Sequence, residues 1–268
     1  MKIDGKVLAD KILNDLSLEV VKLKEKGVTP TLAVIQIGDD HGSTAYIRQK
    51  QKSAEQIGVT LILSHQSSVI SHQKLQSIIE TYNADPAVHG IIVQRPLPKT
   101  LHASNILPSK DVDGFLTHSP YPVPVAEAVL TIFKQMQLTG PGPVRKIVVI
   151  GRGETAGKPI AEALIKRGYD ISVVHSQTPN PDEIIKTADI VISCVGRPHV
   201  VRRHNIKKET ILISVGLSRD SEGKLHGDYE EDEIEDIASF YTPTPGGVGP
   251  VNVACLMANL VKAASKLL

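Results

Sequence analysis

Short runs of valine and isoleucine recur along this chain, and segments with helical patterns lie between them. Clear examples are TLAVIQIG at 31–38, HGIIVQ at 89–94 and KIVVIGRG at 146–153. Strands that are apolar on both faces are typical of parallel sheets covered by helices. Parallel neighbours also need a long crossover connection, which is usually a helix. The alternation therefore predicts an α/β fold.

The alternation occurs in two blocks, because a loop-rich stretch at 95–124 interrupts it before it resumes at Val125. We therefore expect two domains, 1–124 and 125–249. The last helix carries an apolar stripe, so it must dock on a core. The stripe consists of Val253, Leu256, Met257, Leu260, Val261 and Ala264.

The same patterns predict the individual elements. The expected strands are 31–38, 59–65, 89–94, 146–153, 170–176, 188–196 and 209–216. Before the last helix, the expected helices are one that Asp4 caps and that ends at Gly27, and those at 43–57, 75–82, 125–137, 155–167 and 181–187. We interpret TGPGP at 139–143 as a linker.

Composition and local sequence argue against several classes of protein. The chain has 30 basic and 29 acidic residues, no basic block and only 3% aromatic residues, so we expect no nucleic-acid surface. No apolar stretch approaches the length of a membrane span, and the first residues lack the apolar region of a signal peptide. Cys194 and Cys255 lie in apolar runs without a C-x-x-C pair, which is typical of buried thiols in a reducing compartment. We expect a cytoplasmic protein with neither a membrane partner nor a metal centre.

A glycine-rich turn opens the second block. Gly151, Gly153 and Gly157 form G-x-G-x-x-x-G between a strand and a helix, one residue longer than the usual dinucleotide fingerprint. Such a turn lets backbone amides approach a pyrophosphate, and the helix N-terminus stabilises its negative charge. The pattern favours a dinucleotide site; a tight strand–helix turn without a ligand is the alternative.

The end of the next strand indicates which dinucleotide binds. NAD sites carry an acid there to hold the ribose hydroxyls, whereas this chain has His175 and Ser176, with Arg152 in the glycine-rich turn. An acid would repel a 2′-phosphate, while a histidine, a hydroxyl and an arginine would accept one. We therefore predict NADP; the alternative is that His175 and Ser176 only start a polar loop.

In the first block, Tyr46 and Lys50 are spaced i, i+4, so both face one side of a helix. Gln94 ends a buried strand, where α/β sheets present their ligand groups. Asp113 follows in a loop. Converging on one cleft, these side chains would form an acid–base site. The alternatives are a solvated charged helix face and a surface turn at Asp113.

The stretch YTPTPGGVGPVN at 241–252 combines three prolines with three glycines directly before the last helix. Prolines fix φ and glycines permit φ values that other residues avoid, so the backbone path is both stiff and unusual. Two interpretations remain open from these residues, a turn that links domains and a backbone that approaches a ligand closely.

Six motifs occur in order over nearly the whole chain. They are STAYIRQKQK (43–52), GIIVQRPLP (90–98), KDVDGF (110–115), VIGRGETAGKP (149–159), HSQT (175–178) and TPTPGGVGP (242–250). Together they resemble the bifunctional methylenetetrahydrofolate dehydrogenase/methenyltetrahydrofolate cyclohydrolase family.

The resemblance implies an N-terminal α/β catalytic domain, 1–124, completed by 250–268, and a Rossmann-type NADP-binding domain, 125–249. It implies oxidation of 5,10-methylenetetrahydrofolate with NADP and hydrolysis of the methenyl product to 10-formyltetrahydrofolate, in one-carbon metabolism and purine biosynthesis. Its implied partners are tetrahydrofolate derivatives and a second copy of the chain, in a homodimer.

The resemblance also implies roles for residues. Lys50 matches the catalytic lysine, Gln94 the partner that orients it, Tyr46 the aromatic that stacks on the folate rings, and Asp113 the acid that anchors the pterin. The implied cofactor-binding residues are Gly151, Arg152, Gly153, Gly157, His175, Ser176, Gly216 and Leu217. The implied substrate-binding residues, besides Tyr46 and Asp113, are Pro245, Gly246, Gly247, Val248, Gly249, Pro250 and Asn252.

The chain departs from the family pattern at four places. Arg95 stands where leucine is usual, Gly153 where serine is usual, and Asn252 where threonine is usual. The segment after Phe115 is roughly a dozen residues shorter. Two alternatives to the bifunctional enzyme therefore stay open: a cyclohydrolase with a weakened or altered dehydrogenase, and a non-catalytic NADP- or folate-binding regulatory protein.

Overall fold

The computed structural model describes residues 1–98, 100–138 and 145–266, and the chain forms two compact units. The three-stranded unit comprises Ala9–Pro124 and Val253–Leu268. The five-stranded unit comprises Met1–Leu8 and Val125–Asn252. The predicted linker at 139–143 lies outside the described residues. The prediction of a two-domain α/β fold is confirmed.

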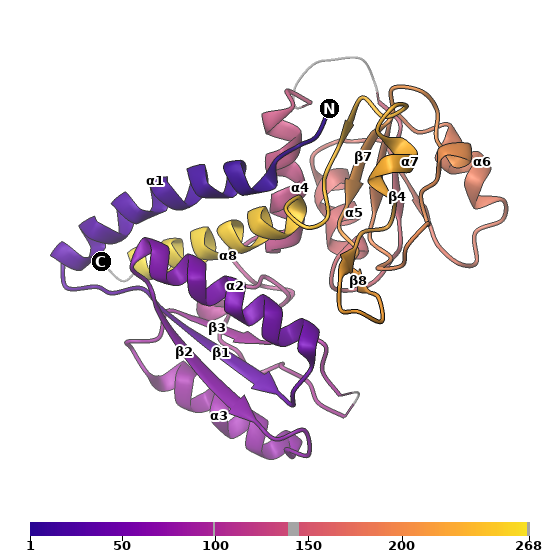
Figure 1. The fold of residues 1–268 in the computed structure, drawn as a ribbon. Coiled ribbons are helices and arrows are strands. Elements are labelled where there is room, and N and C mark those ends of the chain that lie inside the picture. The colour runs from indigo at the N-terminus through magenta and orange to yellow at the C-terminus, as the bar shows by residue number, and fades with distance from the viewer. Residues whose placement is uncertain (99, 139–144, 267–268) are drawn as a thin grey trace. The chain divides into compact units, whose positions relative to one another are not determined.

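The three-stranded unit holds a parallel sheet in the order β2-β1-β3, with helices on both sides (Figure 1). Its strands are β1 (Thr31–Ile37), β2 (Thr60–Gln66) and β3 (Gly90–Val93). Its helices are most of α1 (Gly5–Glu25), α2 (His41–Ile57), α3 (His72–Ala84), the short 3-10 helix η1 (Pro108–Lys110) and most of α8 (Val248–Ser265).

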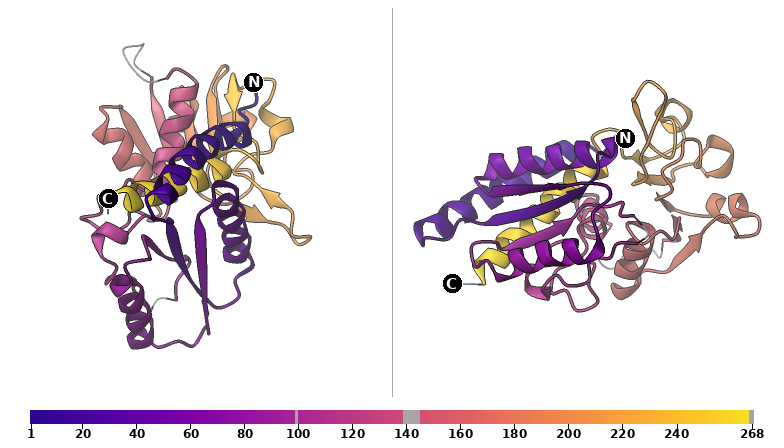
Figure 2. Two further views of the ribbon diagram at one scale, coloured as in Figure 1. Left: turned by 90° about the vertical axis from the view of Figure 1, so that its left-hand side faces the viewer. Right: turned by 90° about the horizontal axis from the view of Figure 1, so that it is seen from below.

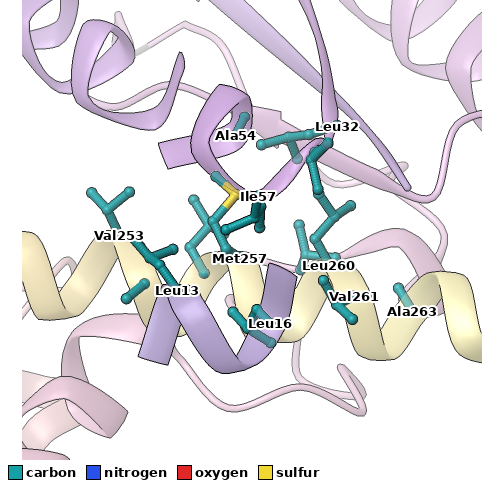
Figure 3. Packing of buried hydrophobic residues seen from close by; sticks show 14 of the residues in the cluster. Leu13, Leu16, Leu32, Ala54, Ile57, Val253, Met257, Leu260, Val261 and Ala263 are labelled. Atoms are coloured by element: carbon teal, nitrogen blue, oxygen red, sulfur yellow. The ribbon is translucent and has the colours of Figure 1, made fainter. Parts of the chain in front are cut away.

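The central strand β1 is buried on both faces, as its apolar run predicts. Leu32 and Val34 face a cluster formed with side chains of α1, α2 and α8, among them Met257 and Leu260 (Figure 3). Ala33 and Ile35 face a second cluster, which includes side chains of α3. The last helix therefore packs on the core of the N-terminal domain, as expected.

The five-stranded unit holds a second parallel sheet, in the order β10-β7-β6-β4-β5. Its strands are β4 (Ile147–Ile150), β5 (Ile171–Val174), β6 (Ile190–Ser193), β7 (Ile211–Ser214) and β10 (Phe240–Tyr241), with a separate antiparallel pair of β8 (Ser218–Arg219) and β9 (Leu225–His226). Its helices are α4 (Pro124–Gln135), α5 (Gly157–Lys166), α6 (Pro181–Lys186), α7 (Glu231–Ile234) and the 3-10 helix η2 (Arg203–Asn205).

Helices cover this second sheet as well (Figure 2). Val148 and Ile150 of β4 belong to a cluster with Ile185 of α6 and Ile234 of α7. Helix α5 packs on β4 and β5. Strand β4 lies between β5 and β6, so the chain runs from β4 first to one side and then to the other. The carboxyl ends of strands at such a reversal are where open α/β sheets bind ligands.

The first residues differ from the expected domain boundary, since Met1–Leu8 belong to the five-stranded unit. The Ile3 amide donates to the Tyr241 carbonyl at 2.8 Å, and the Tyr241 amide donates to the Met1 carbonyl at 3.0 Å. The Gly5 amide donates to the Gly246 carbonyl at 2.9 Å. These backbone bonds fix the N-terminus beside β10, and a two-residue strand has no periodicity that could have predicted them.

The expectation that no stretch approaches a membrane span is wrong for α8 by length and composition alone. Its 18 residues have a mean hydropathy of 1.2, and 67% of that window is buried inside the protein. Burial of this extent is the pattern of a core helix.

Candidate functional site

Helix α2 carries the first two candidate residues. It begins after Asp40, whose carboxylate accepts a hydrogen bond from the Ser43 amide at 2.7 Å and so caps the helix. Tyr46 and Lys50 lie one turn apart on it. Tyr46 is half-buried, whereas only 8% of Lys50 is exposed. The alternative of a solvated face for Lys50 is therefore wrong.

Lys50 and Gln94 form a direct pair. The Lys50 amine donates to Gln94 Oε1 at 2.8 Å. Gln94 follows β3 directly, and its Nε2 donates to the Arg95 carbonyl at 2.9 Å. Because the amide nitrogen is occupied in this way, the oxygen faces the lysine. The structure thus brings these two predicted residues together and fixes their orientation.

Asp113 lies in a tightly closed loop after η1. The neighbouring Asp111 is buried, and its carboxylate accepts a hydrogen bond from the Leu116 amide at 2.9 Å. Gly114 has φ +72°, and a Cβ there would lie 2.8 Å from the Pro122 carbonyl, so only glycine fits. This closure holds the half-buried Asp113 in the electrostatic environment of Lys50.

For Lys50 and for Asp113, burial and the charge of the other side chain shift the pKa in opposite directions. Burial lowers the pKa of Lys50, and the negative charge of Asp113 partly opposes this. Burial likewise raises the pKa of Asp113, and the positive charge of Lys50 opposes it. Burial also raises the pKa of Tyr46. An amine that loses its proton more easily than an exposed lysine can exchange protons with a substrate.

Arg95, which stands where leucine is usual in the family pattern, directly follows Gln94. Its guanidinium carbon stands 4.6 Å from the centre of the Phe115 ring, a cation–π geometry. The Arg95 carbonyl accepts hydrogen bonds from Gln94 and, at 3.2 Å, from the Ser43 hydroxyl. The extra charge therefore belongs to the same group of residues as Lys50 and Asp113.

The glycine-rich turn follows β4 at the carboxyl edge of the second sheet. Gly151 has φ +101°, and a Cβ on Gly157 would lie 2.1 Å from the Gly151 carbonyl oxygen, so the chain's own packing requires glycine at both positions. A Cβ on Gly153 would meet no atom of the residues that the structure describes within 4 Å. The N-cap residue of α5, Ala156, makes no side-chain capping bond. An open turn leading into a helix N-terminus that has no side-chain cap fits a pyrophosphate.

The candidate 2′-phosphate residues lie next to this turn. Arg152 donates to Gln177 Oε1 at 2.8 Å, and the Gln177 amide donates to His175 Nδ1 at 3.2 Å. Gln177 thus links the arginine of the glycine-rich turn to the end of β5, where Ser176 is exposed. A guanidinium, an imidazole and a hydroxyl gathered at this point fit a phosphate.

Gly216 and Leu217 lie in the loop that follows β7. A Cβ on Gly216 would lie 2.2 Å from the Gly196 amide nitrogen and 2.4 Å from Asp228 Oδ2. A Cβ on Gly196 would lie 2.9 Å from the Leu217 carbonyl oxygen. The loops after β6 and β7 therefore touch backbone to backbone, and this contact requires the glycine at 216.

Sequence reasoning missed Asp228, which organises these loops. It is fully buried, and its carboxylate accepts hydrogen bonds from the amides of Val195 at 3.1 Å and Arg197 at 2.9 Å. Its own amide donates to the Ser214 hydroxyl at 2.9 Å. A Gly-Asp pair between two short elements carries no pattern that distinguishes it from a surface turn.

The TPTPGGVGP stretch leads from β10 into α8. The Tyr229 hydroxyl donates to the Thr242 carbonyl at 2.6 Å, and the Thr242 hydroxyl accepts from the Ser214 amide at 2.9 Å. A Cβ on Gly5 would lie 1.8 Å from the Gly247 carbonyl oxygen. The backbone of this stretch therefore lies in close contact with the start of α1.

The remaining residues of this stretch lie at the start of α8. Thr244–Pro245 is a cis peptide, and Gly246 has φ +106°. The first turns of α8 carry Val248, Gly249, Pro250 and Asn252. Their binding to substrate stays a prediction.

Comparison with known proteins explains why these two sites occur in one chain. The model of the "Tetrahydrofolate dehydrogenase/cyclohydrolase, catalytic domain" matches residues 3–113. The model of the "Tetrahydrofolate dehydrogenase/cyclohydrolase, NAD(P)-binding domain" matches residues 124–268.

Similar proteins match over nearly their whole length. The curated bifunctional protein FolD of Lactococcus lactis is 38% identical over 277 residues, which covers 98% of this chain and 97% of the relative. The solved structure of FolD from Campylobacter jejuni is 33% identical with a TM-score of 0.94, covering 100% of this chain and 99% of that one. The Trypanosoma brucei FolD, solved with NADP and an inhibitor, is 32% identical with a TM-score of 0.93, covering 100% and 98%. The chain belongs to the tetrahydrofolate dehydrogenase/cyclohydrolase family.

Proposed function

We propose that this protein oxidises 5,10-methylenetetrahydrofolate to the 5,10-methenyl cation with NADP and then hydrolyses the cation to 10-formyltetrahydrofolate. Matches to both family domains support the pair of activities. The observation that carries the proposal is the buried Lys50 amine, held at 2.8 Å by Gln94. Asp113 lies within electrostatic reach of that amine.

NADP, when bound, supplies the hydride acceptor. The chain's own residues bind and orient it: the turn Gly151–Gly157 receives the pyrophosphate, and Arg152, His175 and Ser176 receive the 2′-phosphate. In the three-stranded unit, Tyr46 stacks on the folate rings, and the Asp113 carboxylate accepts hydrogen bonds from the pterin. Binding the two rings and orienting them are contributions that the protein makes to hydride transfer.

Hydrolysis depends on Lys50. Water attacks the methenyl carbon, a C–O bond forms, the bond from that carbon to N5 breaks, and one proton is released overall. A neutral amine can accept the proton from the attacking water and return it to N5. Burial lowers the pKa of Lys50 and so raises the share of this neutral form. Gln94 keeps the amine directed at one place.

A spectrophotometric assay with methylenetetrahydrofolate, run with NADP and separately with NAD, tests the proposal. We expect NADPH to form faster than NADH, and added methenyltetrahydrofolate to be hydrolysed. Hydrolysis without cofactor reduction would favour a monofunctional cyclohydrolase. The intact Lys50–Gln94 pair beside the shortened segment after Phe115 is the observation that keeps this second candidate open. If the protein showed neither oxidation nor hydrolysis, both candidate functions would be overturned, and a non-catalytic binding protein would remain.

We also propose that the protein is a cytoplasmic homodimer whose product serves purine biosynthesis, and that it binds neither nucleic acid nor a membrane. The family resemblance supports the dimer, and so does an exposed apolar edge. Val173 on the edge strand β5 is 39% exposed, and Ile165 on α5 is 59% exposed. Light scattering of the purified protein should give twice the chain mass; the mass of one chain would contradict the dimer.

A further inference from the structure

The backbone on both sides of Asp113 is closely packed. Val112 is fully buried and lies against β3, since an added Cβ on Gly90 would be 2.8 Å from Val112 Cγ2. On the other side, an added Cβ on Gly114 would lie 2.8 Å from the Pro122 carbonyl. The residues before and after Asp113 are therefore each held against another segment of the three-stranded unit.

One side chain of the last helix bonds to both sides of this loop. Asn259 lies in α8 and is only 5% exposed. Its Nδ2 donates to the Val112 carbonyl at 2.8 Å and to the Pro122 carbonyl at 2.9 Å. The first carbonyl belongs to the peptide bond that joins Val112 to Asp113, and the second belongs to the segment on which Gly114 packs. Both hydrogens of the amide thus hold backbone next to Asp113.

Asn259 is a polar residue among apolar neighbours on α8. Met257, Leu260 and Val261 all belong to the buried cluster of the three-stranded unit. A buried amide costs free energy unless it is hydrogen-bonded, and an apolar side chain would pack on such a cluster without that cost. An apolar side chain at 259 would, however, leave two buried backbone carbonyls without their donor. The loop, rather than the helix, therefore requires the asparagine.

We propose that Asn259 is a positioning residue, which supports folate binding by holding Asp113 in place for the pterin. This inference rests on the proposed function and deepens it. A carboxylate accepts hydrogen bonds well only over a narrow range of distance and angle. Asp113 lies in an irregular loop, so the two bonds from α8 supply the rigidity that a regular element would otherwise give.

The test measures the Kd of tetrahydrofolate by titration calorimetry, and KM and kcat for methenyltetrahydrofolate hydrolysis, in the wild type and Asn259→Leu. Tetrahydrofolate carries the pterin but lacks the one-carbon group, so it binds without turnover. In Asn259→Leu, Kd and KM should both rise by about 10-fold to 100-fold, the loss expected for a hydrogen bond to a charged group. The value of kcat should stay close to that of the wild type, because the pterin is anchored equally in the ground and transition states.

Met257→Ala is the matched control for stability. Met257 is fully buried in α8 among side chains of α1 and α2 (Figure 3), so this variant weakens the same helix and keeps both bonds of Asn259. Its Kd and KM should stay at the wild-type values, even where thermal unfolding shows both variants equally destabilised. An equal rise in the two variants would overturn the inference, and so would a folded Asn259→Leu with the wild-type Kd. Asn259→Ser keeps one donor; it serves if the leucine variant does not fold, and should show a smaller rise.

A double-mutant cycle tests whether Asn259 acts through Asp113. Asp113→Ala removes the pterin anchor, so adding Asn259→Leu to it should leave Kd almost unchanged. A further rise as large as in the single variant would show that Asn259 acts elsewhere, and would overturn the inference. A wild type that binds tetrahydrofolate without hydrolysing methenyltetrahydrofolate would instead sink the proposed hydrolysis, and the Kd values would still decide the role of Asn259.

Discussion

At the scale of single residues, the chemistry depends on how the Lys50 amine is surrounded. Burial disfavours its charge, the Asp113 carboxylate favours it, and Gln94 holds the group by a hydrogen bond of 2.8 Å. Burial is the largest of the influences on its pKa. The amine therefore gives up its proton more easily than an exposed lysine, which suits it to exchange protons with water and substrate.

The kcat of hydrolysis should accordingly rise with pH through a pKa below the ordinary lysine value of 10.5. The sign follows from the mechanism, because the protonated amine that predominates at low pH cannot accept a proton from water. A pH–rate profile at saturating substrate measures this limb. A rising limb at or above 10.5 would show that Lys50 is not the titrating group.

Two different replacements of Gln94 should move the rising limb of this pH–rate profile in opposite directions. Gln94→Glu places a negative charge beside the amine, which favours its protonated form and moves the limb to higher pH. Gln94→Leu removes a hydrogen bond to the charged form and moves the limb to lower pH. Profiles of both variants check this; shifts in one common direction would contradict the electrostatic account.

At the scale of elements, the predicted strands and helices agree with the structure to within a few residues where the apolar runs are long. Tyr46, Lys50 and Gln94 were predictable because helical spacing and a strand end place their side chains. Asp228 and the β8–β9 pair were not, since two-residue elements and an isolated Gly-Asp have no period. The motif of the glycine-rich turn also does not reveal why each glycine is there. Packing within the described part of the chain requires Gly151 and Gly157, whereas it does not require Gly153.

Two of these glycines should therefore respond differently to alanine. Gly157→Ala places a Cβ 2.1 Å from a backbone oxygen and should lower the free energy of unfolding by ~1–3 kcal/mol. The Cβ of Gly153→Ala meets no atom of the described residues within 4 Å, and serine is usual at this position in the family, so stability and KM for NADP should both stay close to the wild-type values. Thermal unfolding and cofactor kinetics separate the two effects. Equal destabilisation by both variants would contradict the proposed arrangement of the turn.

At the scale of the whole molecule, two helices each run from one compact unit of the chain into the other. Helices α1 and α8 each contribute residues to both units. The apolar stripe of α8 predicted that it docks on a core, and the family resemblance predicted which one. The N-terminal pairing with Tyr241 was not predictable, because backbone hydrogen bonds between distant segments leave no trace in hydropathy.

The contribution of α8 to the three-stranded unit can be measured. Leu260 is fully buried among side chains from α1, α2 and β1, so Leu260→Ala should cost about 2–5 kcal/mol of unfolding free energy. Leu18→Ala makes the same change at a position that is 64% exposed, and should stay within about 0.5 kcal/mol. Urea unfolding of both variants provides the comparison. A cost below that of Leu18→Ala would mean that α8 does not complete this core.

We propose that the buried Lys50 amine performs the hydrolysis. The most direct measurement is the initial rate of methenyltetrahydrofolate hydrolysis by the wild type, Lys50→Met and Lys52→Met. Lys52 lies on the exposed side of the same helix and controls for loss of a lysine. We predict a loss of about 10²–10⁴-fold for Lys50→Met, the range typical of a positioned proton-transfer group, and little change for Lys52→Met. A folded Lys50→Met protein that hydrolyses at the wild-type rate would show that the Lys50 amine does not perform the hydrolysis.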